Sequence, residues 1–167
     1  AHYDDSDLLP KTKGKLALQQ RLGLEIDENA PLLGVVSRLT YQKGLDMLLE
    51  CLPALLENGA QLAVLGSGDP EFERRYQQLA QRYGGRASVT TGFSEALSHQ
   101  IMAGADIFLM PSRFEPCGLN QMYSLRYGTV PVVRATGGLD DTVFDVDEKT
   151  GEGTGFTFRA YTVEAMM

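Results

Sequence analysis

Short apolar segments and longer segments with helical spacing alternate along almost the whole chain, and this alternation restricts the fold more than any other feature. The apolar segments are typical of buried strands and lie at 32–37, 61–65, 87–91, 106–110, 130–133 and 154–158. The segments between them predict helices at 44–57, 70–83, 95–103 and 119–127. Alternating strands and helices form right-handed βαβ units, whose parallel sheet is covered on both faces. We therefore expect an α/β fold with a doubly wound, mostly parallel, Rossmann-like sheet.

The composition of the chain excludes several classes of protein. Its 167 residues suffice for one domain with a sizeable core, and 43% of them are apolar. None of the apolar runs approaches the roughly 20 residues that cross a bilayer. The net charge of −7 argues against nucleic acid or an anionic membrane surface as a partner. The two cysteines, Cys51 and Cys117, have neither disulfide-framework nor metal-site spacing, so we expect a reducing compartment, no metal and no cofactor.

Both ends of the chain depart from the alternating pattern. Residues 1–15 are polar and rich in lysine, and residues 15–22 have the spacing of a possible helix. We expect residues 1–30 to be an interdomain linker or arm, and residues 31–167 to be the folded domain. A last helix begins near residue 161 and ends with the chain, which indicates a piece of a longer protein.

The turn at 111–121 carries the densest group of candidate functional residues. It joins the apolar strand at 106–110 to a predicted helix, so it lies at the carboxyl edge of the sheet, where open α/β folds bind ligands. Glu115 precedes a proline, which keeps its carboxylate in the turn. We interpret this carboxylate as an acceptor for sugar hydroxyls or, alternatively, as an acid stabilised by the helix dipole. Outward-facing amides that can hold an anion are expected at Gly118, Leu119 and Asn120.

Two features near this turn extend the candidate site. Cys117 is either a reactive thiol or a small buried apolar side chain. A second flexible, amide-rich loop is predicted at Thr136, Gly137 and Gly138. The acids that follow, Asp140 and Asp141, are expected to cap the next helix.

Two cations flank the turn after the first predicted strand. Arg38 and Lys43 lie at the two ends of this turn. An arginine fork together with a lysine charge suits a pyrophosphate, because the arginine can grip it through paired hydrogen bonds. The alternative is a pair of solvated surface cations, the usual role of an isolated Arg or Lys. The position at a strand end favours the pyrophosphate interpretation.

Gly66 and Gly68 match the first two glycines of the dinucleotide-binding motif Gly-x-Gly-x-x-Gly. The third glycine position of that motif is Glu71 here, so an NAD-dependent dehydrogenase is disfavoured. We expect Asp69 to cap the helix that follows.

The turn after the third predicted strand holds another candidate group. Phe93 could offer its ring to a nucleotide base, or it could pack between the sheet and a helix. Ser94 is a plausible helix N-cap, and Glu95 begins the predicted helix. All these turns follow strands of one parallel sheet, so we expect them to converge on one edge.

Four segments carry a specific residue order: VSRLTYQKGL at 36–45, PSRFEPCGL at 111–119, YGTVP at 127–131 and TGGLDDTV at 136–143. Together they resemble the C-terminal domain of glycogen and starch synthases, which are retaining glucosyltransferases that use ADP-glucose and have two Rossmann-like domains. The resemblance implies a glycosyltransferase fragment whose partners are ADP-glucose, an α-1,4-glucan acceptor and its own N-terminal domain. It also implies a bacterial cytoplasm or a plant plastid.

The resemblance implies a role for each candidate. Arg38 and Lys43 would bind the diphosphate and stabilise the charge on the departing ADP, and Glu115 would hold the glucosyl hydroxyls. The loop at 93–95 would lie beside the adenine. The amides at 118–120 would reach the distal phosphate or the sugar, with Cys117 and the loop at 136–138 also contacting the substrate.

The sequence also departs from the wider pattern of such enzymes. Tyr123 stands where related retaining transferases carry a second glutamate. The glycine-rich donor loop and the catalytic polar residues that such enzymes carry in their other domain have no counterpart in this sequence. We therefore expect the isolated chain to bind ADP or ADP-glucose weakly and not to catalyse transfer. Two alternatives stay open: a UDP-glucose-using domain of the sucrose or trehalose-phosphate synthase type, and a non-catalytic nucleotide-binding module.

Overall fold

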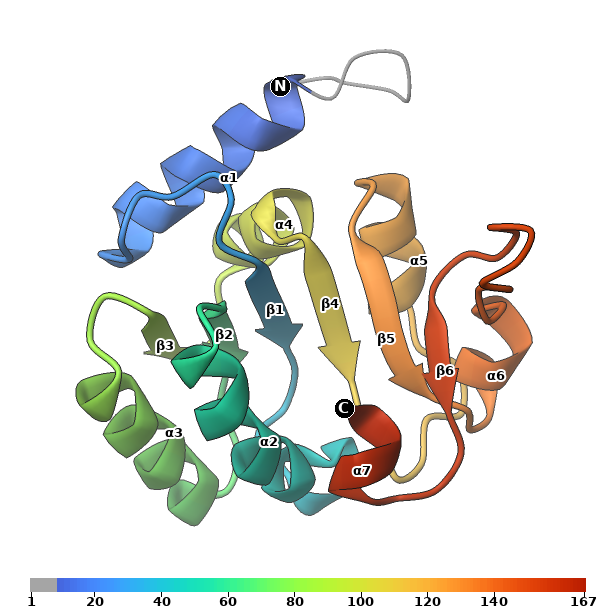
Figure 1. Ribbon diagram of the computed structural model, residues 1–167. Coiled ribbons are helices and arrows are strands. Elements are labelled where there is room, and N and C mark those ends of the chain that lie inside the picture. Colours follow the sequence, from blue (N-terminus) through green and yellow to red (C-terminus); the bar gives the residue numbers. More distant parts are fainter. Residues whose placement is uncertain (1–8) are drawn as a thin grey trace.

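The computed structural model describes residues 9–167 and contains one six-stranded parallel sheet (Figure 1). The strand order is β3-β2-β1-β4-β5-β6, and every neighbouring pair is parallel. The strands are β1 Leu32–Val36, β2 Gln61–Gly66, β3 Ala87–Thr91, β4 Ile107–Met110, β5 Val130–Arg134 and β6 Phe156–Phe158. All six predicted strands are thus confirmed, as is the doubly wound α/β class. The order reverses direction between β1 and β4, which makes that gap the switch point of the sheet.

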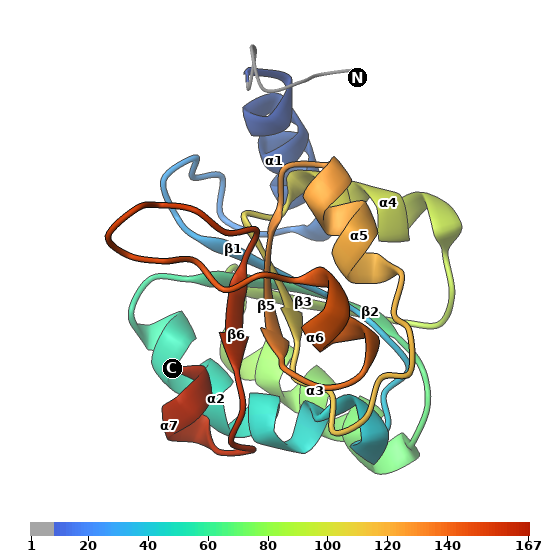
Figure 2. The ribbon, with the colours of Figure 1, turned by 90° about the vertical axis from the view of Figure 1, so that its right-hand side faces the viewer.

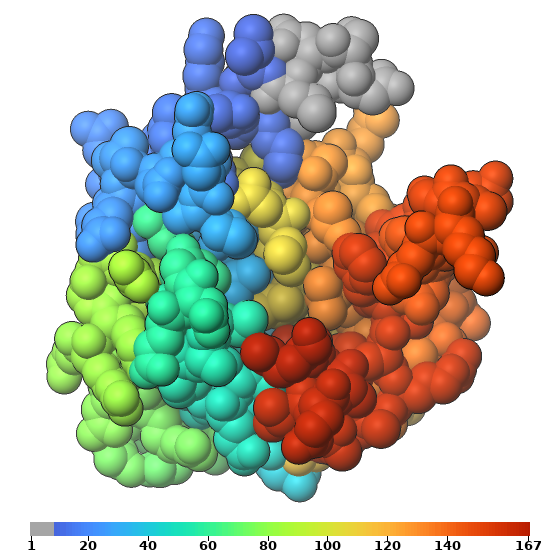
Figure 3. Space-filling model, viewed as in Figure 1, coloured from blue at the N-terminus to red at the C-terminus, as the bar shows by residue number. Residues whose placement is uncertain are grey.

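Helices cover both faces of the sheet (Figure 2). They are α1 Leu9–Leu22, α2 Leu45–Glu57, α3 Pro70–Arg82, α4 Glu95–Gly104, α5 Asn120–Arg126, α6 Gly138–Thr142 and α7 Val163–Met166, with a 3₁₀ turn η1 at Tyr41–Lys43. Side chains of β2 alternate between two cores, because successive residues of a strand point to opposite faces. Leu62 and Val64 pack with α2 and α3, whereas Ala63 and Leu65 pack with α1 and α4. On the first face α7 lies beside α2 (Figure 3).

The helix caps confirm two sequence predictions and overturn a third. The Asp69 carboxylate accepts a hydrogen bond from the Glu71 amide at 2.8 Å, and the Ser94 hydroxyl accepts one from the Leu97 amide at 3.3 Å. The prediction that Asp140 and Asp141 cap α6 is wrong, because both lie inside its first turn and the cap residue is Gly137. The two acids still favour this helix, since negative charge at a helix N-terminus interacts well with its dipole.

The helix α1 begins at Leu9 and not near residue 15, and it packs against α4. Few of its side chains are apolar and buried, so periodicity alone gave only a weak signal. The Lys15 ammonium is buried and pairs with the Asp106 carboxylate at 2.6 Å, beside the start of β4. Residues 1–8 of the predicted arm lie outside the described residues. The assignment of residues 1–30 as an interdomain linker remains a prediction.

Candidate functional site

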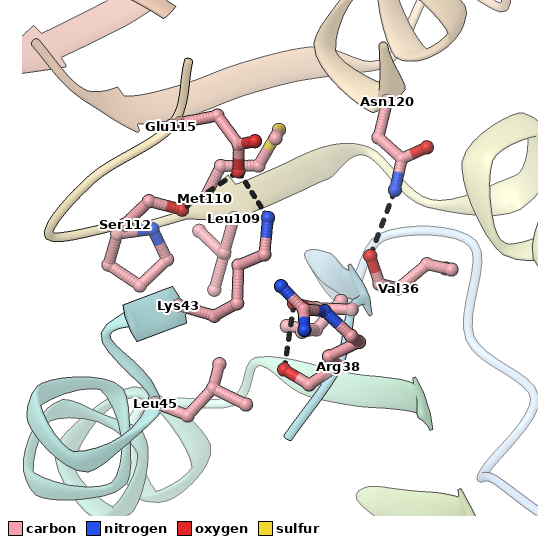
Figure 4. Close-up of a pocket in the computed structure, with 12 residues that line it drawn as sticks. Val36, Arg38, Lys43, Leu45, Leu109, Met110, Ser112, Glu115 and Asn120 are labelled. Atoms are coloured by element: carbon pink, nitrogen blue, oxygen red, sulfur yellow. Dashed lines mark hydrogen bonds and ion pairs between the residues drawn. The ribbon is translucent and has the colours of Figure 1, made fainter. Parts of the chain in front are cut away.

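A polar cleft of about 180 Å³ opens at the switch point of the sheet, between the carboxyl ends of β1 and β4 (Figure 4). Its floor is made by apolar residues of the two strands, including Val36 and Met110. Its polar walls carry four residues that the sequence singles out: Arg38, Lys43, Glu115 and Asn120. In open α/β sheets, ligands bind at this position because the loops diverge where the strand order reverses.

Lys43 and Glu115 form an ion pair across this cleft (Figure 4). The Lys43 ammonium, from η1, contacts the Glu115 Oε2, from the turn after β4; their side chains are only 18% and 9% exposed. The Ser112 hydroxyl also donates to Oε2, at 3.4 Å. Within residues 9–167, no hydrogen bond to Glu115 Oε1 is found. One carboxylate oxygen is therefore held by the protein, and the other is available to a ligand.

Arg38 supplies an unneutralised charge at the same cleft. Its side chain is exposed, and in the described part of the chain its guanidinium makes no ion pair. The cleft thus carries two cations and one carboxylate, a net positive charge in a chain whose total is −7. The alternative that both residues are solvated surface cations agrees with the exposed side chain of Arg38. It does not hold for Lys43, whose side chain is mostly buried and ion-paired.

The two turns that bear Lys43 and Glu115 are joined by backbone contacts. The Arg113 amide donates to the Gln42 carbonyl at 2.9 Å, and the Gln42 side-chain amide donates to the Phe114 carbonyl at 3.2 Å. Gly44 has φ +73°, and a Cβ added there would clash with the backbone carbonyl of Pro111. Only glycine allows this close approach. These contacts therefore hold the two turns that carry Lys43 and Glu115 close together.

Sequence reasoning missed Ser112 and Gln42, both of which act in this cross-connection. Gln42 precedes Lys43, and Ser112 lies in the same turn as Glu115. Their closeness in sequence to these two candidates was the one signal that could have identified them. Asn120 was expected to act through its amide, yet its side chain also matters. It donates to the Val36 carbonyl at 2.9 Å and so ties the start of α5 to the end of β1.

The remaining parts of the turn at 111–121 lie outside the cleft lining. Cys117 is exposed and free, so the interpretation as a buried apolar side chain is wrong. Within residues 9–167, no acceptor is found for three backbone amides expected to face outward, those of Gly118, Leu119 and Asn120. These amides remain predicted anion ligands.

The loop at 136–138 packs directly on this turn. The Gly138 amide donates to the Glu115 carbonyl at 3.0 Å. A Cβ added at Gly137 or Gly138 would clash with the carbonyl of Glu115 or Cys117, respectively. Thr136 leads into this contact and is partly buried. The expected convergence of the two loops is therefore observed, while their contact with a substrate stays a prediction.

The turn at 93–95 lies at the end of β3, two strands away from the cleft. Phe93 is 89% exposed, so the alternative that it packs between sheet and helix is wrong. The Ser94 hydroxyl is engaged in capping α4, and Glu95 is exposed in the first turn of that helix. A role beside a nucleotide base remains a prediction for these three residues.

In residues 9–167, no group of His, Cys, Asp and Glu side chains is arranged to hold a metal ion. Among the helices of this range, none combines the length and the apolar character needed to cross a bilayer.

Comparison with known proteins decides the family. Residues 19–167 match the family model described as glycosyl transferases group 1. The chain belongs to this family. The match includes every strand and all of the candidate residues of this glycosyl transferase domain.

Individual relatives of this group 1 glycosyl transferase are similar over all or nearly all of its length. It is 53% identical over 167 residues to a glycogen synthase of Anaeromyxobacter dehalogenans, covering 100% of this chain and 35% of the relative. It is 56% identical over 162 residues to a glycogen synthase of Cellvibrio japonicus, covering 96% and 34%. The chain thus spans about a third of the length of the curated relatives it matches.

Solved structures agree with the fold of this glycosyl transferase domain. The catalytic domain of starch synthase IV from Arabidopsis thaliana, bound to ADP and acarbose, has a TM-score of 0.91 and 38% identity, covering 99% of this chain and 35% of that one. A sucrose-phosphate synthase from Thermosynechococcus elongatus has a TM-score of 0.71 at 24% identity, covering 93% and 39%. The second similarity concerns the fold alone.

Proposed function

We propose that this chain is the nucleotide-sugar-binding domain of a glycogen or starch synthase, which transfers glucose from ADP-glucose to the non-reducing end of an α-1,4-glucan with retention. One observation carries the proposal: Arg38, Lys43 and Glu115 come together in one cleft at the switch point of the sheet. Two cations suit a diphosphate, and a carboxylate oxygen without a protein partner suits a sugar hydroxyl.

The chemistry of glucosyl transfer matches this set of groups. Breaking the bond between glucose and ADP places negative charge on the departing diphosphate and positive character on the sugar ring. Preorganised cations stabilise such developing charge without reorganising during the reaction. In this proposal Arg38 and Lys43 stabilise the leaving diphosphate. Glu115 orients the glucose through its hydroxyl groups, and the amides of the turn at 118–120 assist at the phosphate or sugar.

The comparisons support the choice of ligands. The starch synthase IV structure holds ADP and acarbose, and this chain is similar to it over 99% of its length. The chain nevertheless corresponds to only 35% of that protein. We propose that the glucan acceptor site and the remaining catalytic groups belong to a second domain, and that the present chain alone binds nucleotide weakly and does not elongate glucan.

Calorimetric titration of the chain with ADP and with UDP tests the nucleotide. We expect binding of ADP that exceeds that of UDP. Replacing Arg38 with alanine should weaken ADP binding about ten- to a hundredfold, because a charge-assisted contact contributes roughly 1.5–3 kcal/mol. Arg74→Ala is the matched control, since Arg74 lies on α3 in an exposed pair with Glu71. A preference for UDP would favour the sucrose or trehalose-phosphate synthase alternative.

An elongation assay tests the division of labour between domains. The chain alone should add no glucose to a glucan, whereas the longer protein should do so. In the longer protein, unchanged turnover after Glu115→Ala would support the alternative of a non-catalytic nucleotide-binding module.

A further inference from the structure

Arg113, two residues before Glu115, is held on three sides by groups from other parts of the chain. Its guanidinium donates to both carboxylate oxygens of Asp46, at 2.6 and 2.7 Å. It lies between two aromatic rings, 3.3 Å from the ring centre of Tyr41 and 3.9 Å from that of Tyr161. An arginine can combine a bidentate ion pair with stacking in this way because its guanidinium is planar.

The partners of Arg113 come from three other segments of the fold. Tyr41 belongs to η1, Asp46 to the first turn of α2, and Tyr161 to the segment that leads into α7. The Tyr161 hydroxyl donates to the Asp46 carboxylate at 2.9 Å, which closes the group. We name these four residues the Arg113 cluster. Its ion pair is mostly shielded from water, because the side chains of Arg113 and Asp46 are only 23% and 25% exposed.

The Arg113 cluster connects directly to both turns of the candidate site. Besides the Arg113 amide, which binds the carbonyl of Gln42 beside Lys43, its guanidinium donates to the Tyr41 carbonyl at 2.8 Å. The Arg113 carbonyl accepts a hydrogen bond from the Arg134 side chain at 2.9 Å. The residue is thus fixed at its amide, its carbonyl and its side chain. Arg113 therefore contacts both the turn that carries Lys43 and the turn that carries Glu115.

We propose that Arg113 is a positioning residue: held by Asp46, Tyr41 and Tyr161, it sets the Lys43 ammonium against the Glu115 carboxylate and thereby controls nucleotide affinity. The proposal rests on the proposed function for its ligand, but the geometric part stands on contacts within the chain. A purely structural role would affect the stability of the fold without affecting the site selectively. Lysine cannot replace the arginine, because it offers neither paired hydrogen bonds nor a stacking plane.

The first experiment needs no ligand. Hydrogen–deuterium exchange of the Arg113→Lys variant should be faster in peptides covering 41–45 and 111–118 than in the unaltered chain. Peptides from α3 should exchange as before. Arg74→Lys serves as the control, because Arg74 makes an exposed ion pair on α3. Unchanged exchange in the two site peptides would overturn the proposal, as would a uniform increase over the whole chain.

The second experiment uses ADP and a double-mutant cycle. Arg113→Lys should weaken ADP binding about tenfold, as expected when a binding group is displaced. The same substitution made together with Lys43→Ala should cause almost no further loss, because the group that Arg113 positions is then absent. Equal losses in both backgrounds, or unchanged affinity, would overturn the proposal. If the unaltered chain binds neither ADP nor UDP, the proposed function fails, while the exchange experiment still decides on Arg113.

Discussion

The Lys43 ammonium and the Glu115 carboxylate form an ion pair, although 72 positions separate them in the chain. The pair means that the two groups do not act as independent ligands. The charge of Lys43 is partly compensated before any diphosphate arrives, so Arg38 is the cation with full charge to offer. The pair also orients Glu115, with Oε2 toward Lys43 and Ser112 and Oε1 left for a hydroxyl group.

Removal of the lysine should cost stability as well as affinity. In Lys43→Met the mostly buried Glu115 loses its counter-charge, and we expect the free energy of unfolding to fall by about 1–3 kcal/mol. The double variant Lys43→Met with Glu115→Gln should recover most of that stability, but not ADP binding. Thermal unfolding and calorimetry measure the two effects. A double variant no more stable than the single one would contradict the ion-pair account.

Glu115→Gln should separate nucleotide binding from sugar binding. The substitution keeps the shape of the side chain and frees the Lys43 charge, so ADP should bind as tightly as before or more tightly. ADP-glucose should lose the advantage that it has over ADP, because the amide is a weaker acceptor for sugar hydroxyls. Parallel titrations with the two ligands measure this difference. Equal weakening of both ligands would place Glu115 at the diphosphate instead.

Asp46 makes the stability of the Arg113 cluster depend on pH. Burial alone would raise the pKa of the Asp46 carboxyl, but hydrogen bonds from Arg113 and Tyr161 outweigh it and lower the pKa below the ordinary 3.8. As the pH falls through about 3.8, the carboxyl of Asp46 is protonated in the unfolded chain but not yet in the native one. The free energy of unfolding therefore falls. The stabilisation is therefore present above this pH and is lost as the pH drops through the native pKa.

The measurement for this prediction is urea unfolding of the unaltered chain and of Asp46→Asn over a series of pH values. The unaltered chain should be more stable than Asp46→Asn at neutral pH. The difference between their free energies of unfolding should become smaller in acid. A difference of the same size at every pH would show that the charge of Asp46 does not stabilise the fold.

Gly44 should be the most sensitive glycine of the site. Alanine there combines a strained backbone at φ +73° with a clash against the Pro111 carbonyl, so the loss should exceed the roughly 1 kcal/mol that the backbone alone costs. Gly59→Ala is the matched control, because Gly59 has φ +95° and open space around its Cα. Denaturant unfolding compares the two variants. Equal losses would argue against tight contact between the two turns.

Local patterns predicted most of this fold, because the strands and the helices α2, α3, α4 and α5 have apolar residues at the spacing typical of each element. The same patterns brought Arg38, Lys43 and Glu115 to one edge of the sheet, since parallel strands place their following turns together. Contacts between distant segments were not predictable in this way. The Lys15 ammonium of α1 pairs with Asp106, 91 positions away, and the Arg113 cluster includes Tyr161, 115 positions from Asp46.

The error at Asp140 and Asp141 has a similar cause. Acidic residues before a helix are typical caps, but here α6 already begins at Gly138, which lies close to the Cys117 carbonyl. This contact is made between the loops at 111–121 and 136–138. In the local sequence, only the paired glycines Gly137 and Gly138 indicate it.

The most direct test of the proposed site is nuclear magnetic resonance of the ¹⁵N-labelled chain during titration with ADP. We predict shifts of amide signals concentrated in residues 37–44 and 111–120, at the ends of β1 and β4, with α3 unaffected. The same titration of Arg38→Ala should require much more ADP for the same shifts. Shifts that cluster away from these two turns, or that are unchanged in the Arg38 variant, would contradict the assignment of this cleft to the nucleotide.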